Sequence, residues 1–495
     1  LEYRKKSNRM CYNRRKSDEN PPLLTIHTQE KTMKHIRKII SALILLAEMS
    51  ALYILIPYIT DSGLRNAFFT PPRAAAVIPA CFLGLFLFVF INIFPRFTFL
   101  RTFGSRNQIL EDGAALLQLF LSTVVAESLF VILYTLFLRP DGAGPGYVVG
   151  RLVSLLFLVL MESVLFWNGI IRVYTTSVQL GIKWRVIGIV CGWIPLVHIW
   201  ALCRIIAITS REAAFEEEKF LLDQIRAESR LCETKYPLLL VHGVFFRDFR
   251  FFNYWGRIPH ALKQNGASVY YGSQQSAASV ADCGQELAER ILAIVRETGC
   301  ERVNIIAHSK GGLDSRYAIS ACGAAPYVAS LTTINTPHRG CIFADYLLDK
   351  IPVKIQKSVA RKYNAALKKF GDSNPDFLAA VRDLTASACD RRNSMLPNCP
   401  EVFYQSVGSQ MNCASSGRFP LNMAYPLVRH FDGANDGLVS LESACWGDNF
   451  TRLVTSEGRG ISHGDMIDLN RENVPGFDVR EFYVNLVANL KNRGL

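Results

Sequence analysis

The stretch VNIIAHSKGGLDSRY, residues 303–317, decides how the C-terminal half of the chain folds. Its first four residues are typical of a short buried strand, and the residues after Gly311 are typical of a helix. Ser309 stands between them, with the small residues Ala307 and Gly311 two positions before and after it. A serine on a strained strand-to-helix turn needs small residues there, because strand and helix must approach each other closely. The stretch therefore predicts a nucleophilic Ser309 and not an ordinary turn.

The rest of the C-terminal half alternates between strand-like and helix-like segments. The predicted strands are 238–241, 267–271, 303–307 and 331–335. The predicted helices are 258–264, 283–298 and 311–320. Strands that alternate with helices imply a parallel sheet with right-handed crossovers, so the predicted fold class is α/β.

Two residues are candidates for stabilising an oxyanion. The run LLLVHGV, residues 238–244, is an early strand that ends in a His-Gly loop. An ester carbonyl under attack develops negative charge, which needs preorganised backbone N–H donors. In a fold of this kind one donor is the residue after the nucleophile, Lys310. The other lies just beyond the early strand, where Val244 is the best candidate. His242 is expected to brace this loop and not to act as the base.

The base and the acid follow from chain order, because hydrolases with such a turn present serine, then acid, then histidine. His463 is the only one of the nine histidines that follows the Asp-rich segment 432–436. Asp436, in the run NDGLV, is the predicted acid, and Asp432 is the alternative. His463 is expected to take the proton of Ser309 and deliver it to the leaving alcohol, while the acid orients the imidazole ring.

Several segments resemble the bacterial triacylglycerol lipases of the Pseudomonas and Burkholderia type. They are residues 303–317, the run TTINTPHRG at 332–340 followed by FAD at 343–345, and the run NDGLVS at 435–440. The resemblance covers about residues 236–495 and implies an α/β-hydrolase fold, hydrolysis of carboxylic esters and a lid over the active site at about 346–371. By position, it makes Ser309, Asp436 and His463 the triad and Val244 and Lys310 the oxyanion donors.

The structural calcium of this family carries over only in part. Asp465 matches one of the two aspartate ligands. The segment that should supply the other, residues 412–417, reads NCASSG and contains no acid. Asp465 is therefore the one candidate metal ligand, without an acidic partner, and the chemistry itself requires no cofactor.

The expected lid contains an apolar stripe at helical spacing. The stripe comprises Leu347, Ile351, Ile355, Val359 and Tyr363. A lid that opens on a lipid surface should turn such a stripe inward, toward the active site. The lysines between the stripe residues either meet anionic lipid headgroups or form a solvated helix face.

The N-terminal half contains five long apolar runs, at 39–60, 77–99, 114–138, 148–171 and 186–208. A helix of about 20 apolar residues crosses a bilayer, and each run meets that length. Buried helices of a large soluble domain are the alternative, which the short basic or Gly/Pro loops between the runs disfavour. The predicted architecture is listed from the N-terminus: a basic tail (1–38), an all-α transmembrane domain (39–208), an amphipathic linker helix (209–235) and the hydrolase domain (236–495).

The net charge of +13 is a topology signal and not the mark of a nucleic-acid binder. Residues 1–208 carry 22 Lys/Arg against 11 Asp/Glu, whereas residues 209–495 carry 33 against 31. The basic residues gather in the tail and in alternate loops, which is the pattern of cytoplasmic segments. We expect an integral protein of a bacterial cell membrane with a cytoplasmic N-terminus. Five crossings place the hydrolase domain outside the cytoplasm, where disulfides could form among Cys389, Cys399, Cys413 and Cys445.

Three acidic residues, Glu48, Glu127 and Glu162, lie inside the apolar runs. Acidic groups at membrane depth are costly and often functional. They are interpreted as helix–helix contacts or interfacial residues, and the alternative is a transport or relay role.

Together the motifs predict a membrane-anchored serine lipase or esterase whose partners are the lipid bilayer and a lipid ester substrate. An acyltransferase or phospholipase that uses the same triad is the nearest alternative. A transporter or sensor whose hydrolase-like domain only binds lipid is the alternative from another class.

Overall fold

The computed structural model describes residues 8–11, 21–68, 70–97, 105–138, 144–244, 253–369, 371–447, 449–455 and 458–495. The chain divides into two compact units. The sheet unit contains Leu1–Arg14 and Asp223–Leu495, and the helical unit contains Arg15–Leu222. Residues 1–7 and 12–20 of the predicted basic tail lie outside the described residues.

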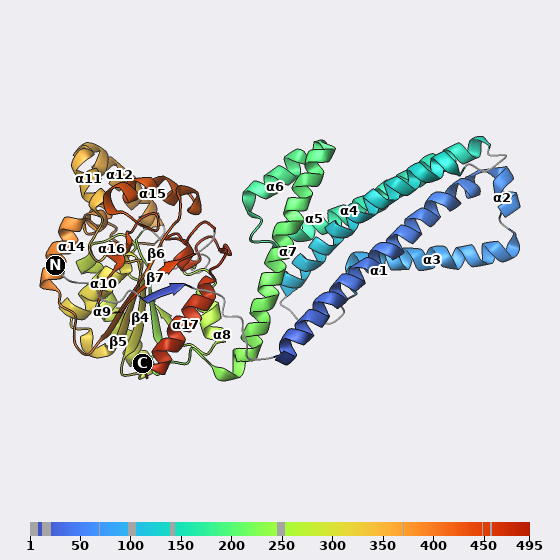
Figure 1. Ribbon diagram of the computed structural model, residues 1–495. Coiled ribbons are helices and arrows are strands. Elements are labelled where there is room, and N and C mark those ends of the chain that lie inside the picture. The colour runs from blue at the N-terminus through green and yellow to red at the C-terminus, as the bar shows by residue number, and fades with distance from the viewer. Residues whose placement is uncertain are drawn as a thin grey trace. The chain divides into compact units, whose positions relative to one another are not determined.

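The sheet unit is built around seven strands in the order β1-β7-β6-β5-β4-β2-β3, and every neighbouring pair is parallel (Figure 1). The strands are β1 (Asn8–Cys11), β2 (Leu238–Val241), β3 (Val269–Tyr271), β4 (Val303–His308), β5 (Val328–Ile334), β6 (Phe403–Ser409) and β7 (Phe450–Val454). Parallel neighbours need crossover connections, which the intervening helices supply. The predicted α/β-hydrolase class is confirmed, and the four predicted strands correspond to β2–β5.

Helices cover both faces of this sheet. They are α8 (Ile258–Gln264), α9 (Val280–Thr298), α10 (Lys310–Ala321), α11 (Ile342–Lys350), α12 (Val353–Lys369), α13 (Phe377–Arg382), α14 (Ala386–Met395), α15 (Leu421–Asp432), α16 (Leu441–Ala444) and α17 (Val479–Asn492). Short 3-10 turns are η2 (Ala227–Ser229), η3 (Ala325–Tyr327), η4 (Ala414–Ser416) and η5 (Asp465–Ile467). In β2, Leu238 and Leu240 join the apolar cluster of α8 and α17, whereas Leu239 and Val241 join the cluster of α9. Because side chains alternate along a strand, both faces of the sheet are buried.

An N-terminal strand completes one edge of the sheet. β1 pairs with β7, with Asn8 opposite Thr451 and Cys11 opposite Val454. These residues belong to the predicted basic tail, and the run NRMC has none of the β-branched or aromatic residues that indicate a strand. The pairing protects the outer edge of β7 and ties the N-terminal segment to the sheet unit.

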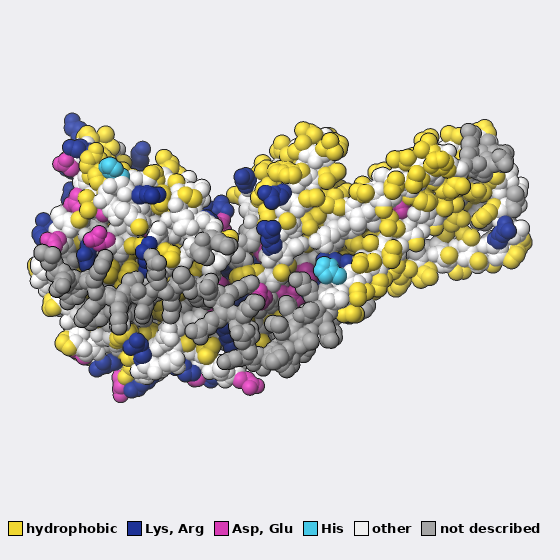
Figure 2. Space-filling view, in the orientation of Figure 1, with side chains coloured by type: hydrophobic (Ala, Val, Ile, Leu, Met, Phe, Trp, Pro, Cys, Tyr) yellow, Lys and Arg dark blue, Asp and Glu magenta, His cyan; other side chains and the backbone are white. Residues whose placement is uncertain are grey.

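The helical unit consists of long apolar helices. They are α1 (Pro21–Thr60), α2 (Ser62–Phe68), α3 (Pro71–Ile93), α4 (Ser105–Phe137), α5 (Pro145–Thr176), α6 (Gly181–Val190), η1 (Cys191–Trp193) and α7 (Pro195–Arg226). Within the described residues, four segments are long and apolar enough to cross a membrane: Thr32–Thr60, Pro71–Ile93, Arg106–Phe137 and Pro145–Thr176. Hydrophobic side chains cover most of the visible face of these helices (Figure 2), as lipid contact requires.

The fifth predicted run, 186–208, has a different structure. Gly192 and Pro195 interrupt it, so that α6 and α7 form a hairpin with Trp193 at its tip, 91% exposed (Figure 1). The hairpin closes at its base, where Ser177 Oγ and the N–H groups of residues 178 and 179 donate to the carboxylate of Glu212 at 2.6–3.1 Å. α7 then continues without a break to Arg226, where the sequence analysis expects a separate linker helix.

Candidate active site

Ser309 lies on a strained turn between β4 and α10. Its φ of 55° and ψ of −132° place it in a backbone region that residues with side chains rarely adopt. Its backbone N–H donates to the carbonyl of Ile334 on β5 at 2.9 Å. A Cβ added to Gly312 would lie only 2.1 Å from Thr336 Oγ1, so the helix start fits against the loop after β5 only with glycine at this position. The turn therefore has the geometry predicted for a nucleophile.

The structure brings His463 and Asp436 together. His463 Nδ1 lies 2.7 Å from Asp436 Oδ2, and both side chains are buried. The other oxygen, Oδ1, accepts hydrogen bonds from the N–H groups of Leu438 and Val439. These bonds hold the carboxylate still, and the carboxylate in turn holds the imidazole by one nitrogen. The His463 ring packs on the ring of His308, the neighbour of Ser309, with centroids 4.4 Å apart.

Asp432, the alternative acid, binds the start of α11, whereas His463 pairs with Asp436. The carboxylate of Asp432 accepts hydrogen bonds from the N–H groups of Ile342 and Phe343 at 3.0 and 3.3 Å. It therefore caps the N-terminus of α11, a position in which a carboxylate satisfies helix donors.

The candidate oxyanion donors flank the serine. A Cβ on Gly243 would lie 2.8 Å from Ser309 Cβ, so the loop after β2 passes directly beside the nucleophile. Val244 follows Gly243 in that loop, and Lys310 is the first residue of α10. The ring nitrogens of His242 lie 2.8 and 3.0 Å from the carbonyl oxygens of Gly243 and Gln274, so this histidine is engaged by the loop.

Tyr254 supports the loop and the nucleophile turn at the same time, and the sequence analysis does not identify it. Its hydroxyl accepts a hydrogen bond from the N–H of Gly243 at 3.0 Å and lies 2.7 Å from His308 Nδ1. Aromatic residues are common beside this segment, so no local signal separates Tyr254 from its neighbours.

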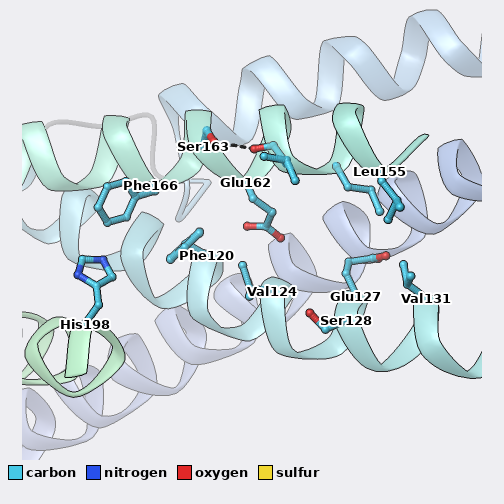
Figure 3. A pocket seen from close by; sticks show the side chains of 12 residues that line it. Phe120, Val124, Glu127, Ser128, Val131, Leu155, Glu162, Ser163, Phe166 and His198 are labelled. Atoms are coloured by element: carbon cyan, nitrogen blue, oxygen red, sulfur yellow. Dashed lines mark hydrogen bonds between the residues drawn. The ribbon is translucent and has the colours of Figure 1, made fainter. Parts of the chain in front are cut away.

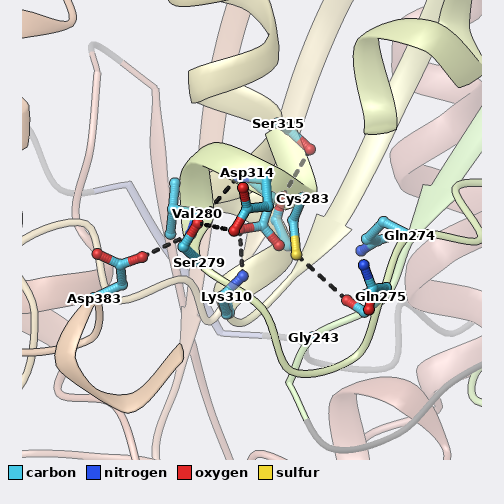
Figure 4. Close-up of polar contacts among 12 residues, drawn as sticks. Gly243, Gln274, Gln275, Ser279, Val280, Cys283, Lys310, Asp314, Ser315 and Asp383 are labelled. Atoms are coloured by element: carbon cyan, nitrogen blue, oxygen red, sulfur yellow. Dashed lines mark hydrogen bonds and ion pairs between the residues drawn. The ribbon is translucent and has the colours of Figure 1, made fainter. Parts of the chain in front are cut away.

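The side chain of Lys310 is buried beneath the site in an ion pair. Lys310 Nζ lies 2.6 Å from Asp314 Oδ1, one turn further along α10, and Cys283 on α9 lies beside them (Figure 4). Burial raises the pKa of the Asp314 carboxyl to about 6, against the opposing effect of Lys310, and burial raises the pKa of the Cys283 thiol to about 12. The pair fixes the first turn of α10 and leaves only the backbone N–H of Lys310 for the site.

Asp465, the candidate calcium ligand, is occupied by a guanidinium group. Arg459 Nη1 and Nη2 lie 3.0 and 2.7 Å from its two oxygens. The backbone N–H and hydroxyl of Ser462 also donate to this carboxylate. The described part of 412–417 supplies no carboxylate, so these residues do not fit a calcium ion. A fixed side-chain cation fills the position instead.

The expected lid consists of α11 and α12, which Figure 1 shows with α15 at one end of the sheet unit. Phe370, at the end of the predicted segment, lies outside the described residues. On α12 the buried residues are Gln356, Ala360 and Leu367. The predicted apolar stripe is mostly exposed: Ile351, Ile355, Val359 and Tyr363 face outward, with Ile355 53% exposed, whereas Leu347 is half-buried. Val244 packs against the small apolar cluster that contains Leu367, so the inner face of α12 and the loop after β2 share one cluster.

Comparison with known proteins gives relatives for the sheet unit. Residues 266–371 match a family described as "Putative serine esterase (DUF676)". A triacylglycerol lipase of Vibrio cholerae serotype O1 is 30% identical in an alignment of 230 residues, which covers 42% of this chain and 73% of that lipase. A triacylglycerol lipase of Pseudarthrobacter phenanthrenivorans is 35% identical in an alignment of 178 residues, which covers 33% of this chain. The chain spans only 55% of the length of this second relative. The crystal structure of Staphylococcus hyicus lipase aligns with a TM-score of 0.42 and 17% identity, over 53% of this chain and 97% of that one.

We predict that chelators leave the sheet unit unaffected. Because Arg459 fills the cation position, EDTA should change neither the thermal midpoint nor ester hydrolysis by the full-length protein. Arg459→Ala should lower the stability by about 2 kcal/mol, since it removes charged hydrogen bonds from a buried carboxylate. Arg459→Lys, which keeps the charge, should lose less. Thermal unfolding with and without EDTA checks this, and a chelator-dependent loss of stability would contradict it.

We also predict acid sensitivity from two buried histidines. Burial lowers the pKa of His308 and of His338 well below the ordinary 6.5. Below pH 6.5 the unfolded chain therefore binds more protons than the folded one. Each histidine should lower the stability by about 1.4 kcal/mol in total between pH 7.5 and 5.5. Urea unfolding followed by tryptophan fluorescence between pH 7.5 and 5.5 measures this loss. His338→Gln should make the pH dependence of the free energy of unfolding weaker. The same pH dependence in this variant and in the parent protein would contradict the role given to His338.

Proposed function

The chain belongs to the family of the bacterial triacylglycerol lipases, and on that premise we propose that it is a serine lipase or esterase that hydrolyses carboxylic esters of lipids. The observation that carries the proposal is the 2.7 Å contact between His463 and Asp436 beside a serine held at a φ of 55°. A carboxylate fixed by backbone donors, a histidine held by that carboxylate, and a strained serine at a strand end are the parts of a nucleophilic acyl-transfer site.

The proposed reaction has two halves. Ser309 Oγ attacks the ester carbonyl carbon while the free nitrogen of His463 takes its proton. The negative charge on the carbonyl oxygen is stabilised by the N–H groups of Val244 and Lys310. The intermediate then expels the alcohol, which takes the proton from His463 and leaves an acyl group on Ser309. Water attacks this ester by the same route, releasing a carboxylic acid and restoring the serine.

Two features support a lipid as the substrate. The relatives are triacylglycerol lipases by name. The outer face of α11 and α12 also combines exposed apolar side chains with lysines, a surface that suits an anionic bilayer. Its exposed apolar residues are Ile342, Tyr346, Ile351, Val353, Ile355, Val359 and Tyr363. Because Leu367 on the inner face of α12 and Val244 share one apolar cluster, lipid contact on the outer face would act on the oxyanion loop.

We further propose that the sheet unit lies on the cytoplasmic side of the membrane. The predicted five crossings would place the sheet unit opposite the cytoplasmic N-terminus, outside the cytoplasm. Four crossings bring the chain back to the cytoplasmic side, and the α6–α7 hairpin, which returns to Ser177 through Glu212, adds no crossing. The pairing of β1 with β7 agrees, because the tail and the sheet must then share one compartment. Cys341 and Cys389 are buried free thiols, which suit a reducing compartment.

We predict that Ser309→Ala abolishes hydrolysis of a p-nitrophenyl ester and labelling by a fluorophosphonate probe. Asp436→Asn should lower kcat about 10⁴-fold, because the imidazole loses its orienting carboxylate. Asp432→Asn is the matched control, since an asparagine can still cap α11, and it should keep most of the activity. Equal losses in Asp436→Asn and Asp432→Asn would refute the assignment of the acid.

The membrane side of the sheet unit is tested by proteolysis. Protease added to intact spheroplasts should leave the sheet unit whole, and protease added to inverted membrane vesicles should cleave it. A soluble periplasmic protein and a soluble cytoplasmic protein serve as controls for leakage. Cleavage of the sheet unit by protease outside intact spheroplasts would contradict the cytoplasmic location and support a topology with five crossings.

A further inference from the structure

A cavity of about 390 Å³ lies within the helical unit, between α4, α5 and α7. Its walls are mostly apolar side chains, among them Phe120, Val124, Leu158 and Phe166. Polar side chains enter it from all three helices: Glu127 and Ser128 from α4, Glu162 and Ser163 from α5, and His198 from α7. Figure 3 shows the carboxylate of Glu162 pointing into the space between α4 and α5.

The two carboxyl groups of this cavity have oxygens without a hydrogen-bond partner within the described chain. Glu162 is 8% exposed, and neither of its oxygens has a partner there. Thr123 is close enough to interact with the Glu162 carboxyl group, but its hydroxyl donates its one hydrogen to the carbonyl of Leu119, at 2.9 Å. Glu127 is 4% exposed, and Ser50 donates to one of its oxygens at 2.9 Å while the other has no partner. Buried acceptors without donors are unfavourable, so these groups are suited to receive hydrogen bonds from a ligand.

The shape and the chemistry of the cavity restrict the ligand. The lining contains two carboxyl groups and no lysine or arginine, so it favours a head that donates hydrogen bonds. The volume is far larger than a bare ion needs, and no cluster of three metal-binding side chains occurs among the described residues. The apolar walls suit a hydrocarbon chain.

We propose that this cavity binds a single-chain lipid whose head donates hydrogen bonds to Glu162 and Glu127, through hydroxyl or ammonium groups. The apolar residues of α4 and α5 contact the chain, and the two carboxyl groups fix the head at membrane depth. This site uses none of the residues of the esterase site, and its occupancy does not require ester hydrolysis.

The test uses full-length Ser309→Ala protein in lipid nanodiscs and three photoreactive C18 probes. One carries a glycerol monoether head, one a primary amine, and one a methyl ether that donates no hydrogen bond. We expect saturable labelling of peptides from α4, α5 and α7 by the glycerol or the amine probe, and none by the methyl ether. Equal saturable labelling by the methyl ether would overturn the proposal.

Variants separate the two head groups and control for folding. Glu162→Leu should weaken saturable labelling about tenfold, since it removes the buried acceptor. Glu162→Gln should retain a hydroxyl head and lose an ammonium head. Glu48→Leu, which removes a half-buried acid on α1 outside the cavity, is the matched control and should label normally. Unchanged labelling of folded Glu162→Leu would overturn the proposal, and competition by unlabelled probe on the parent protein tests it independently of any variant.

Discussion

The strained turn at Ser309 is the constraint on which the arrangement of the sheet unit depends. A positive φ at a serine costs on the order of 1–3 kcal/mol and persists only where packing enforces it. That packing comes from β4 on one side and from α10 on the other, where Gly312 fits against Thr336. Because the turn lies at the carboxyl end of a parallel strand, loops from the neighbouring strands reach the same edge. Asp436 and His463 reach it from such loops.

The sequence predicts the central part of this fold because its signals are local. β2 to β5 have compact apolar runs, and the turn at Ser309 follows from residues two positions away. Chain order predicted His463 and left Asp436 and Asp432 as candidate acids, and the structure pairs His463 with Asp436. The roles of these residues in catalysis stay a prediction. β1 was not predictable, because the run NRMC has no local strand signal and becomes a strand only when the edge of β7 is present. Tyr254 was missed for the same reason, since its two partners come from different strand ends.

Buried charge is the second feature that sequence patterns leave open. The spacing of Lys310 and Asp314 would suit an exposed ion pair on a helix, yet both are buried beneath the site. Burying two charges is favourable only when they meet at close range, so the pair also fixes the register of α10. At Asp465, which matches a calcium ligand of the family, the guanidinium group of Arg459 takes the position of a metal ion. In both places a fixed side-chain cation determines the local structure.

Hydropathy shows how long an apolar segment is, but not whether the segment crosses the membrane or turns back as a hairpin. The run at 186–208 is long enough to cross, and only its end contacts distinguish a crossing from a hairpin. The N–H groups at the start of a helix need acceptors, and near lipid the protein must supply them. Glu212 supplies them for residues 178 and 179, so the end of the hairpin lies beside its beginning. The proposed cytoplasmic location of the sheet unit rests on this contact, because a hairpin adds no crossing to the four candidate spans.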